Sequence, residues 1–155
     1  MNKQTLDREW KYFYMVLGVS RKLVDQIPED KMDFRPTPEV RSAMELITHA
    51  FNFLAESVET VTAGRHIDHK EPTFDSKAAL MTWMDVQVAE AFAGFAKLTD
   101  KQLEAKIEAW GETFSGWQML DFAYQEHLHH RGQLTVYLRL MGIEPVFIYD
   151  FSEQH

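Results

Sequence analysis

Apolar side chains recur every three or four residues along four long segments of the chain, a spacing that predicts amphipathic α-helices. These segments cover residues 6–27, 42–64, 76–98 and 115–142. Almost nothing in the sequence reads as a β-strand. Four helices of about 20 residues, joined by connections of mixed length, are typical of a four-helix bundle. We therefore predict an all-α fold.

The ends of these helices are marked by residues that start or stop a helix. Ser42-Ala-Met-Glu45 and Ser115-Gly-Trp-Gln118 have the form of a capping box, in which two side chains satisfy free backbone N–H groups of the first turn. Pro28 ends the first helix, because the residue before a proline avoids the helical conformation. Gly64 and Gly142 are suitable stops for the second and fourth helices.

The connections are less well defined. Residues 99–115 alternate acidic and apolar side chains, which leaves open a short helix or an extended segment. Residues 143–151 are apolar and aromatic, so we expect this tail to pack on the bundle or on a partner subunit. Within the tail, Phe147, Ile148 and Tyr149 are a candidate contact surface for a partner subunit.

Length, charge and composition restrict the classes of protein to which the chain can belong. A chain of 155 residues, 45% of them hydrophobic, can bury one core, so we predict a single domain over residues 1–155. The absence of cysteine excludes disulfides and thiolate metal sites. A net charge of −8 disfavours nucleic acid as a partner. The polar N-terminus and the lack of a long apolar run predict a cytoplasmic protein without membrane partners.

The segment EHLHHRGQL, residues 126–134, contains three of the seven histidines. On a helix, His127 and His130 belong to the inward stripe, Glu126 lies on its flank four residues before His130, and His129 points away. Two side chains spaced by three or four residues can hold one metal ion, but a third ligand must come from elsewhere. His49, on the apolar stripe of the second helix, is the candidate.

A structural role is the competing interpretation for each of these histidines. A single histidine on an apolar face, such as His49, is more often a hydrogen-bonded core residue than a ligand. The fourth-helix histidines could equally form a solvated helix edge. Taken together they favour a site, because burying several imidazoles without partners is costly. We expect His66, His69 and His155 to be surface residues.

Three segments resemble the DinB/YfiT-like family of small bacterial four-helix bundles: residues 129–145, 27–53 and 109–120. The resemblance implies up-down-down-up connectivity, commonly a homodimer, and a divalent metal held by three histidines. His49 matches the ligand on the second helix, and His130 matches the histidine that precedes the arginine. The remaining ligand position falls on Glu126, which is not a histidine.

This departure leaves the third ligand open. Glu126 could complete a set of two histidines and one carboxylate, which suits zinc or nickel. His127 could instead bind after a small rotation of the helix, or metal binding could be weakened or lost. We favour Glu126 with His127 nearby, so the predicted metal residues are His49, Glu126, His130 and His127.

Three hypotheses follow for function. The resemblance implies a metal-dependent S-transferase or hydrolase that activates a low-molecular-weight thiol for reaction with a small-molecule substrate. The first alternative is a metal- or ligand-binding module without turnover, acting in a stress response. The second is a structural dimer with a vestigial site. Bound metal separates the first two hypotheses from the third, and turnover separates the first from the second.

Overall fold

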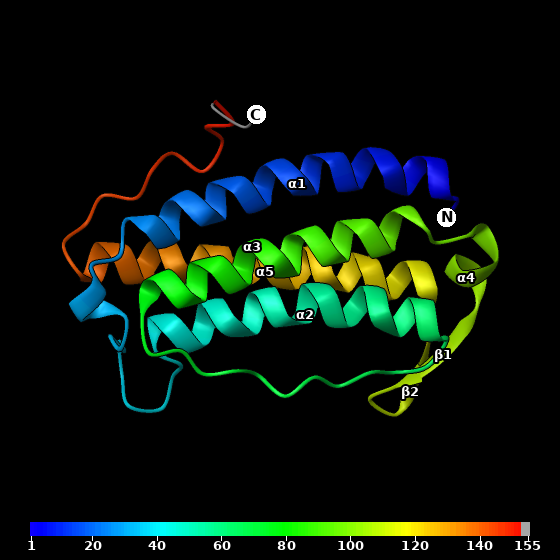
Figure 1. Cartoon of the computed structure of the whole chain (residues 1–155), viewed down its shortest axis with the longest axis horizontal. Helices are drawn as coiled ribbons and strands as arrows, with labels where there is room; N and C mark the ends of the chain where they lie inside the picture. Colours follow the sequence, from blue (N-terminus) through cyan, green and yellow to red (C-terminus); the bar gives the residue numbers. More distant parts are fainter. Residues whose placement is uncertain (153–155) are drawn as a thin grey trace.

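The computed structural model of the protein describes residues 1–152, and over this range four long helices lie side by side (Figure 1). They are α1 (Lys3–Asp25), α2 (Ala43–Ala63), α3 (Lys77–Ala96) and α5 (Gly116–Leu140). α1 and α5 run in one direction along the bundle, whereas α2 and α3 run in the other. The prediction of an all-α bundle with up-down-down-up connectivity is confirmed.

The helix ends follow the signals in the sequence to within three residues. The capping box of α2 is complete, because Glu45 N–H donates to Ser42 Oγ and Ser42 N–H donates to Glu45. Gly64 ends α2 in the left-handed conformation, with φ 66°. α1 begins three residues earlier than predicted, because the side chain of Asn2 accepts the N–H of Thr5 and so caps a polar first turn. One turn of 3-10 helix (Glu29–Lys31) follows α1.

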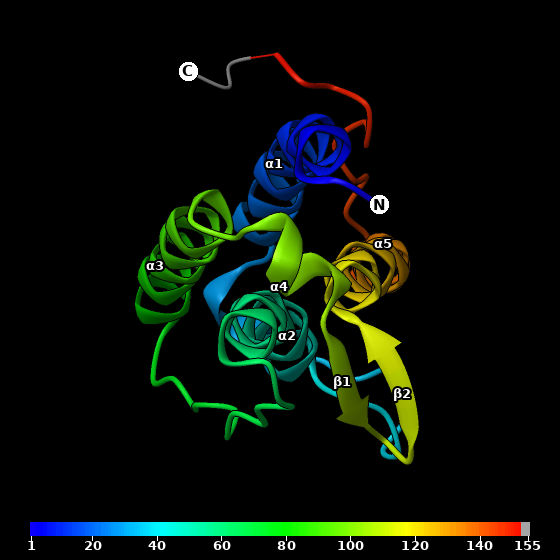
Figure 2. The same cartoon turned by 90° about the vertical axis from the view of Figure 1, so that its right-hand side faces the viewer.

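The connection between α3 and α5 contains both of the alternatives that the sequence left open. A short helix, α4 (Asp100–Glu104), is followed by a two-stranded hairpin of β1 (Lys106–Ala109) and β2 (Glu112–Ser115). The expectation of almost no strand therefore missed this hairpin. Viewed end-on, the hairpin projects beside α2 and α5 (Figure 2).

The hairpin turn is formed by Trp110 and Gly111. Both have positive φ, 51° and 81°, as a two-residue type I′ turn requires. Glycine adopts this conformation freely, but tryptophan does so at a cost in backbone strain. The turn therefore holds a large aromatic side chain in an unusual place, at the tip of the hairpin.

A long crossover connection, residues 64–76, is needed because α2 and α3 are parallel. It runs back along the bundle (Figure 1) and is fixed to polar side chains of α2. The N–H of Ile67 donates to Thr60 Oγ1 at 3.0 Å, and the N–H of His69 donates to Glu56 Oε2 at 2.9 Å. Asn52 donates to the carbonyl of His69 at 3.2 Å. These bonds hold an irregular segment against the middle of α2.

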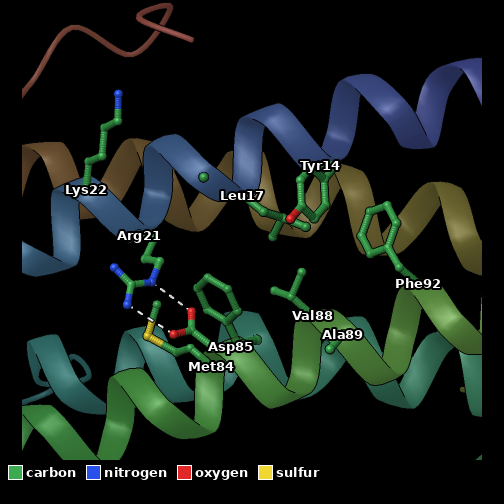
Figure 3. Close-up of a pocket in the computed structure, with 11 residues that line it drawn as sticks. Tyr14, Leu17, Arg21, Lys22, Met84, Asp85, Val88, Ala89 and Phe92 are labelled. Atoms are coloured by element: carbon green, nitrogen blue, oxygen red, sulfur yellow. Dashed lines mark hydrogen bonds and ion pairs between the residues drawn. The ribbon is translucent and has the colours of Figure 1, made fainter. Parts of the chain in front are cut away.

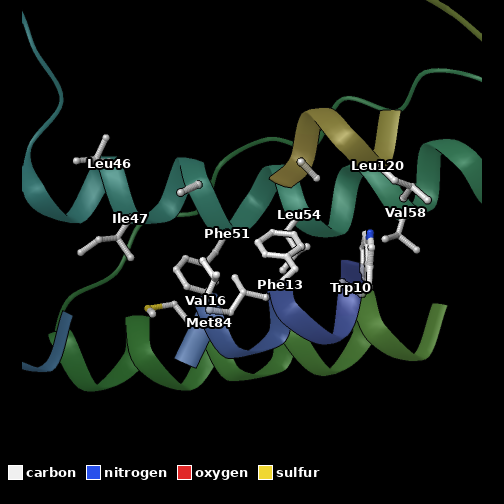
Figure 4. Close-up of a cluster of buried hydrophobic side chains, with 14 of the residues drawn as sticks. Trp10, Phe13, Val16, Leu46, Ile47, Phe51, Leu54, Val58, Met84 and Leu120 are labelled. Atoms are coloured by element: carbon white, nitrogen blue, oxygen red, sulfur yellow. The ribbon is translucent and has the colours of Figure 1, made fainter. Parts of the chain in front are cut away.

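The hydrophobic core lies between the four long helices (Figure 4). Trp10 of α1 stacks on Phe95 of α3, with ring centroids 4.1 Å apart. Phe51 and Leu54 of α2 are almost fully buried in the same cluster. Burial of each such side chain contributes about 1.5–3 kcal/mol. The core therefore fixes α2 against its neighbours and sets the position of the polar residues that α2 carries.

The C-terminal tail folds back onto α1 of its own chain. Gln26 donates to the carbonyl of Glu144 at 2.9 Å and accepts the N–H of Val146 at 2.9 Å. The sequence left open whether the tail packs on the bundle or on a partner subunit, and in the structure it packs on the bundle. Phe147 and Tyr149 of this tail remain 69% and 56% exposed. Among the described residues, no helix combines the length and apolar character needed to cross a membrane.

Candidate metal centre

Three of the predicted metal residues meet where α2 packs on α5. His49 comes from α2, and Glu126 and His130 come from successive turns of α5. Each offers one ligand atom, and these atoms all lie within 4.8 Å of one another. Within residues 1–152, no other set of three or more histidine, aspartate or glutamate side chains converges in this way. We call these three residues the metal cluster.

The metal cluster is buried at one side and open at the other. His130 Nε2 lies 3.1 Å from Glu126 Oε2, as the i, i+4 spacing on one helix allows. The rings of His49 and His130 stand edge to face, with centroids 4.9 Å apart. The His130 side chain is 7% exposed, whereas that of Glu126 is 47% exposed. A ligand can therefore reach the metal cluster from the side of Glu126.

Each histidine of the metal cluster is oriented by an acceptor at its other ring nitrogen. Glu71 Oε1 contacts His49 Nδ1 at 2.5 Å, and Gln133 Oε1 contacts His130 Nδ1 at 2.8 Å. An acceptor at Nδ1 places the proton there and leaves the lone pair on Nε2. Arg41 Nη2 also lies 3.4 Å from His49 Nδ1, but the carboxylate is closer and can accept the proton. Metal-binding histidines are usually held in this way.

Burial also prepares His130 to act as a ligand. Desolvation lowers the pKa of His130, and the nearby His49 adds to this effect, whereas the hydrogen bond to Gln133 opposes it. A depressed pKa keeps the imidazole neutral near neutral pH. A neutral imidazole has the free lone pair that a metal ion requires.

Sequence reasoning missed the two orienting residues, Glu71 and Gln133. Glu71 lies in the crossover connection, 22 residues from His49, and no helical spacing relates the two. Gln133 lies three residues after His130 on α5, so the i, i+3 rule could have found it.

His127 lies apart from the metal cluster, although we expected it nearby. It is 2% exposed, and its Nε2 lies 2.7 Å from Ser20 Oγ of α1. The edges of Phe13 and Phe51 pack against its ring, with centroids 5.5 and 5.2 Å away. One residue along a helix corresponds to a turn of about 100°, so His127 faces the core while Glu126 faces the cluster.

The remaining histidines differ from expectation in part. His66 and His69 are partly buried, and both line a hollow beside His49 instead of lying freely on the surface. His69 Nε2 lies 2.9 Å from Glu59. His155 lies outside the described residues.

A separate groove lies between α1 and α3 (Figure 3). Its volume is about 450 Å³, and its walls are mostly apolar. Arg21 crosses it to form a two-pronged ion pair with Asp85, at 2.7 and 3.0 Å. None of the predicted metal residues lines this groove, so the candidate chemistry of the chain lies at the metal cluster instead.

Sequence comparison identifies relatives of the whole chain. The sequence model of the DinB family matches residues 1–155. The uncharacterized protein YjoA of Bacillus subtilis (strain 168) is 28% identical over 138 residues, which are 84% of this chain and 87% of YjoA. The uncharacterized protein YrdA of the same organism is 24% identical over 157 residues, covering 97% of this chain and 92% of YrdA.

Solved structures agree with the fold. The crystal structure of the DinB-like protein YjoA superposes with a TM-score of 0.75 at 24% identity, covering 89% of this chain and 94% of that one. A DinB-like protein from Bacillus cereus ATCC 10987 gives a TM-score of 0.70 at 19% identity, covering 90% of this chain and 95% of that one. With the family match over its full length, the chain belongs to the DinB family.

Proposed function

We propose that His49, Glu126 and His130 bind one divalent metal ion, either zinc or nickel. The observation that carries this proposal is the convergence of their three ligand atoms within 4.8 Å. Two imidazole nitrogens and one carboxylate oxygen form a known ligand set of catalytic zinc sites. The acceptors at both Nδ1 atoms support the same assignment, because they leave each Nε2 free to bind.

We further propose that the bound metal serves a reaction, the transfer of a low-molecular-weight thiol to a small-molecule substrate or a hydrolysis. Three protein ligands leave a coordination position open, at which a metal lowers the pKa of a bound water or thiol. The 47% exposure of Glu126 gives such a molecule access. A reducing cytoplasm, in which small thiols remain reduced, is the compartment we propose.

In this proposal the protein's own residues have separate tasks. His49 and His130 hold the metal as neutral imidazoles, and Glu126 supplies the negative charge of the ligand set. Glu71 and Gln133 keep the two rings in position through their Nδ1 atoms. The metal cluster is thus assembled from α2, α5 and the crossover connection.

The test is elemental analysis of protein purified without a histidine tag, followed by an assay of thiol transfer to an electrophile. We expect about one zinc or nickel ion per chain, and turnover that a chelator abolishes and the metal restores. Bound metal without turnover on any thiol or ester would support the non-catalytic module instead. Protein that takes up no divalent metal would contradict the proposal and leave a vestigial site.

Glu71 provides a prediction that separates metal binding from folding. Glu71→Gln removes the charge behind His49, so we expect the affinity for zinc to fall by about 10- to 100-fold. Competition with a chromophoric chelator measures this change. Glu59→Gln is the matched control, because Glu59 contacts His69 of the same connection but not the metal cluster. Equal affinities in the two variants would show that Glu71 does not orient a ligand.

We also propose a homodimer that uses the exposed tail. The rings of Phe147 and Tyr149 lie 5.5 Å apart and form a small apolar patch. A second copy of the chain would remove this patch from water. Sedimentation velocity should then give twice the mass of one chain, and a single-chain mass at high concentration would contradict the proposal.

A further inference from the structure

A hollow of about 290 Å³ opens beside the metal cluster. It lies between α2, the crossover connection and the tip of the β-hairpin. His49 and Glu71 line one end of it, and Glu56 lines it two turns further along α2. Seven residues of helix place Glu56 about 10 Å from His49 along the helix axis. The hollow therefore begins at His49, the residue that it shares with the metal cluster, and runs along α2 to Glu56, whereas Glu126 and His130 do not line it.

One wall of this hollow is aromatic. Trp110 lines it from the strained hairpin turn and is 56% exposed, so the side chain is not held there by burial in the core. Its ring centroid lies 6.2 Å from that of Phe53 and 5.1 Å from that of His66. Strained backbone that persists in a fold is often associated with a functional position. The turn presents an indole to whatever occupies the hollow.

Glu56 supplies a buried carboxyl group, and none of the ion pairs found within residues 1–152 includes it. It is 7% exposed, and burial raises its pKa. Its Oε2 accepts the N–H of His69 at 2.9 Å, which leaves Oε1 available to a further donor. Among the described residues, neither lysine nor arginine lines the hollow, and Asp68 adds a further carboxyl group. Burial favours the neutral form of Glu56, and a donor that carries a positive charge would stabilise its carboxylate form.

A second metal ion does not fit this requirement. Among the described residues, candidate ligands converge only at the metal cluster, and Glu56 is not part of that group. A protonated amine fits better, because it carries three hydrogen-bond donors and a compact charge that an indole ring also attracts.

We propose that this hollow is the substrate pocket of the metal cluster, and that it selects a small molecule carrying a protonated amine. The ammonium pairs with Glu56 Oε1 and packs against Trp110, while the other end of the molecule reaches the metal. The spacing on α2 sets the separation of the two ends at about 10 Å. The inference rests on the proposed function only for the end of the molecule that binds the metal. The amine end uses only Glu56 and Trp110, so it does not depend on a bound metal.

The test compares two thiols that differ only at the far end, aminohexanethiol and hexanethiol, on protein loaded with Co²⁺. Thiolate binding is followed by the absorption of the cobalt–sulfur bond. We expect the amine to bind about 10-fold more tightly, as one charged hydrogen bond allows. Glu56→Gln keeps an acceptor for the N–H of His69 and should remove this preference. Glu59→Gln, an exposed change on the same helix, should keep it.

A metal-free arm separates this inference from the proposed function. Hexylamine is added to protein without metal, and the indole N–H of Trp110 is followed by nuclear magnetic resonance. A saturable shift that Glu56→Gln abolishes supports the amine pocket even if Co²⁺ does not bind. Stoichiometric Co²⁺ with equal affinity for both thiols would overturn the inference and leave the metal site intact. Protein that takes up no Co²⁺ and also shows no shift with hexylamine would overturn both proposals.

Discussion

Replacement of His130 by alanine is expected to weaken zinc binding by roughly 100- to 1,000-fold. Structural zinc sites with four ligands are worth about 10–16 kcal/mol, or about 3 kcal/mol for each ligand, and about 1.4 kcal/mol is a factor of ten. Calorimetric titration of metal-free protein with zinc measures the change directly.

The adjacent histidine provides the matched control. His129 is exposed and offers no ligand atom to the metal cluster, although its Nε2 contacts Gln133 at 3.2 Å and its ring centroid lies 5.0 Å from that of His130. We expect His129→Ala to change zinc affinity by less than about threefold, since it removes no ligand. Circular dichroism should show that both variants keep the helical fold. Equal losses in the two variants would point to a general effect on α5 and would contradict a ligand role for His130.

The same titration identifies the third ligand. If Glu126 binds the metal, Glu126→Gln should weaken zinc binding by about 10-fold or more, because a neutral amide is a poorer ligand than a carboxylate. His127→Gln should then leave the affinity nearly unchanged, as its burial against Ser20 implies. The reverse pattern would mean that α5 rotates to bring His127 into the metal cluster.

Helix positions could be predicted because their signals are local. The capping box at Ser42 and the stop at Gly64 depend on residues a few positions apart, and both lie where expected. The hairpin was missed because its strands have only four residues each. Its turn also uses Trp110, a residue that seldom adopts positive φ, in place of the usual asparagine or aspartate.

The site could be predicted only as far as helical geometry reaches. Glu126 and His130 share a face because they are four residues apart, and His49 lies on the helix that packs against that face. Glu71 could not be found in this way, because an irregular connection brings it to His49. Glu56 was hidden for a related reason: its role depends on the same connection, which covers it and donates an N–H to it.

Because of His127, we expect the protein to lose stability in acid. Ser20 Oγ–H donates to the carbonyl of Val16, so the hydroxyl oxygen accepts Nε2–H of His127. Nδ1 of His127 is buried and has no hydrogen-bond partner within residues 1–152. Protonation would place an unpaired charge in the core. Burial, together with the nearby charges of Arg131 and His130, therefore lowers its pKa from 6.5 to about 3.

The direction of this pH effect follows from whether the folded or the unfolded chain binds the proton. Below pH 6.5 the unfolded chain takes up a proton at His127 that the folded chain refuses until about pH 3. The free energy of unfolding should thus be highest above pH 6.5 and fall by about 1.4 kcal/mol per pH unit below it, or about 2 kcal/mol by pH 5. Urea unfolding at pH 7 and pH 5, with a chelator present to remove any metal contribution, measures this slope.

Several carboxyl groups and His130 also titrate in acid. The contribution of His127 is therefore isolated by comparing how steeply the free energy of unfolding changes with pH in the unaltered protein and in a variant. His127→Gln cannot take up the proton, so its loss of stability between pH 7 and pH 5 should be smaller than that of the unaltered protein by about 2 kcal/mol. His129→Gln removes an exposed histidine from the same helix and should leave the slope unchanged. An unaltered slope in His127→Gln would mean that water reaches Nδ1 and that this imidazole is charged in the folded protein. The core packing of Phe13 and Phe51 around the ring argues against that outcome.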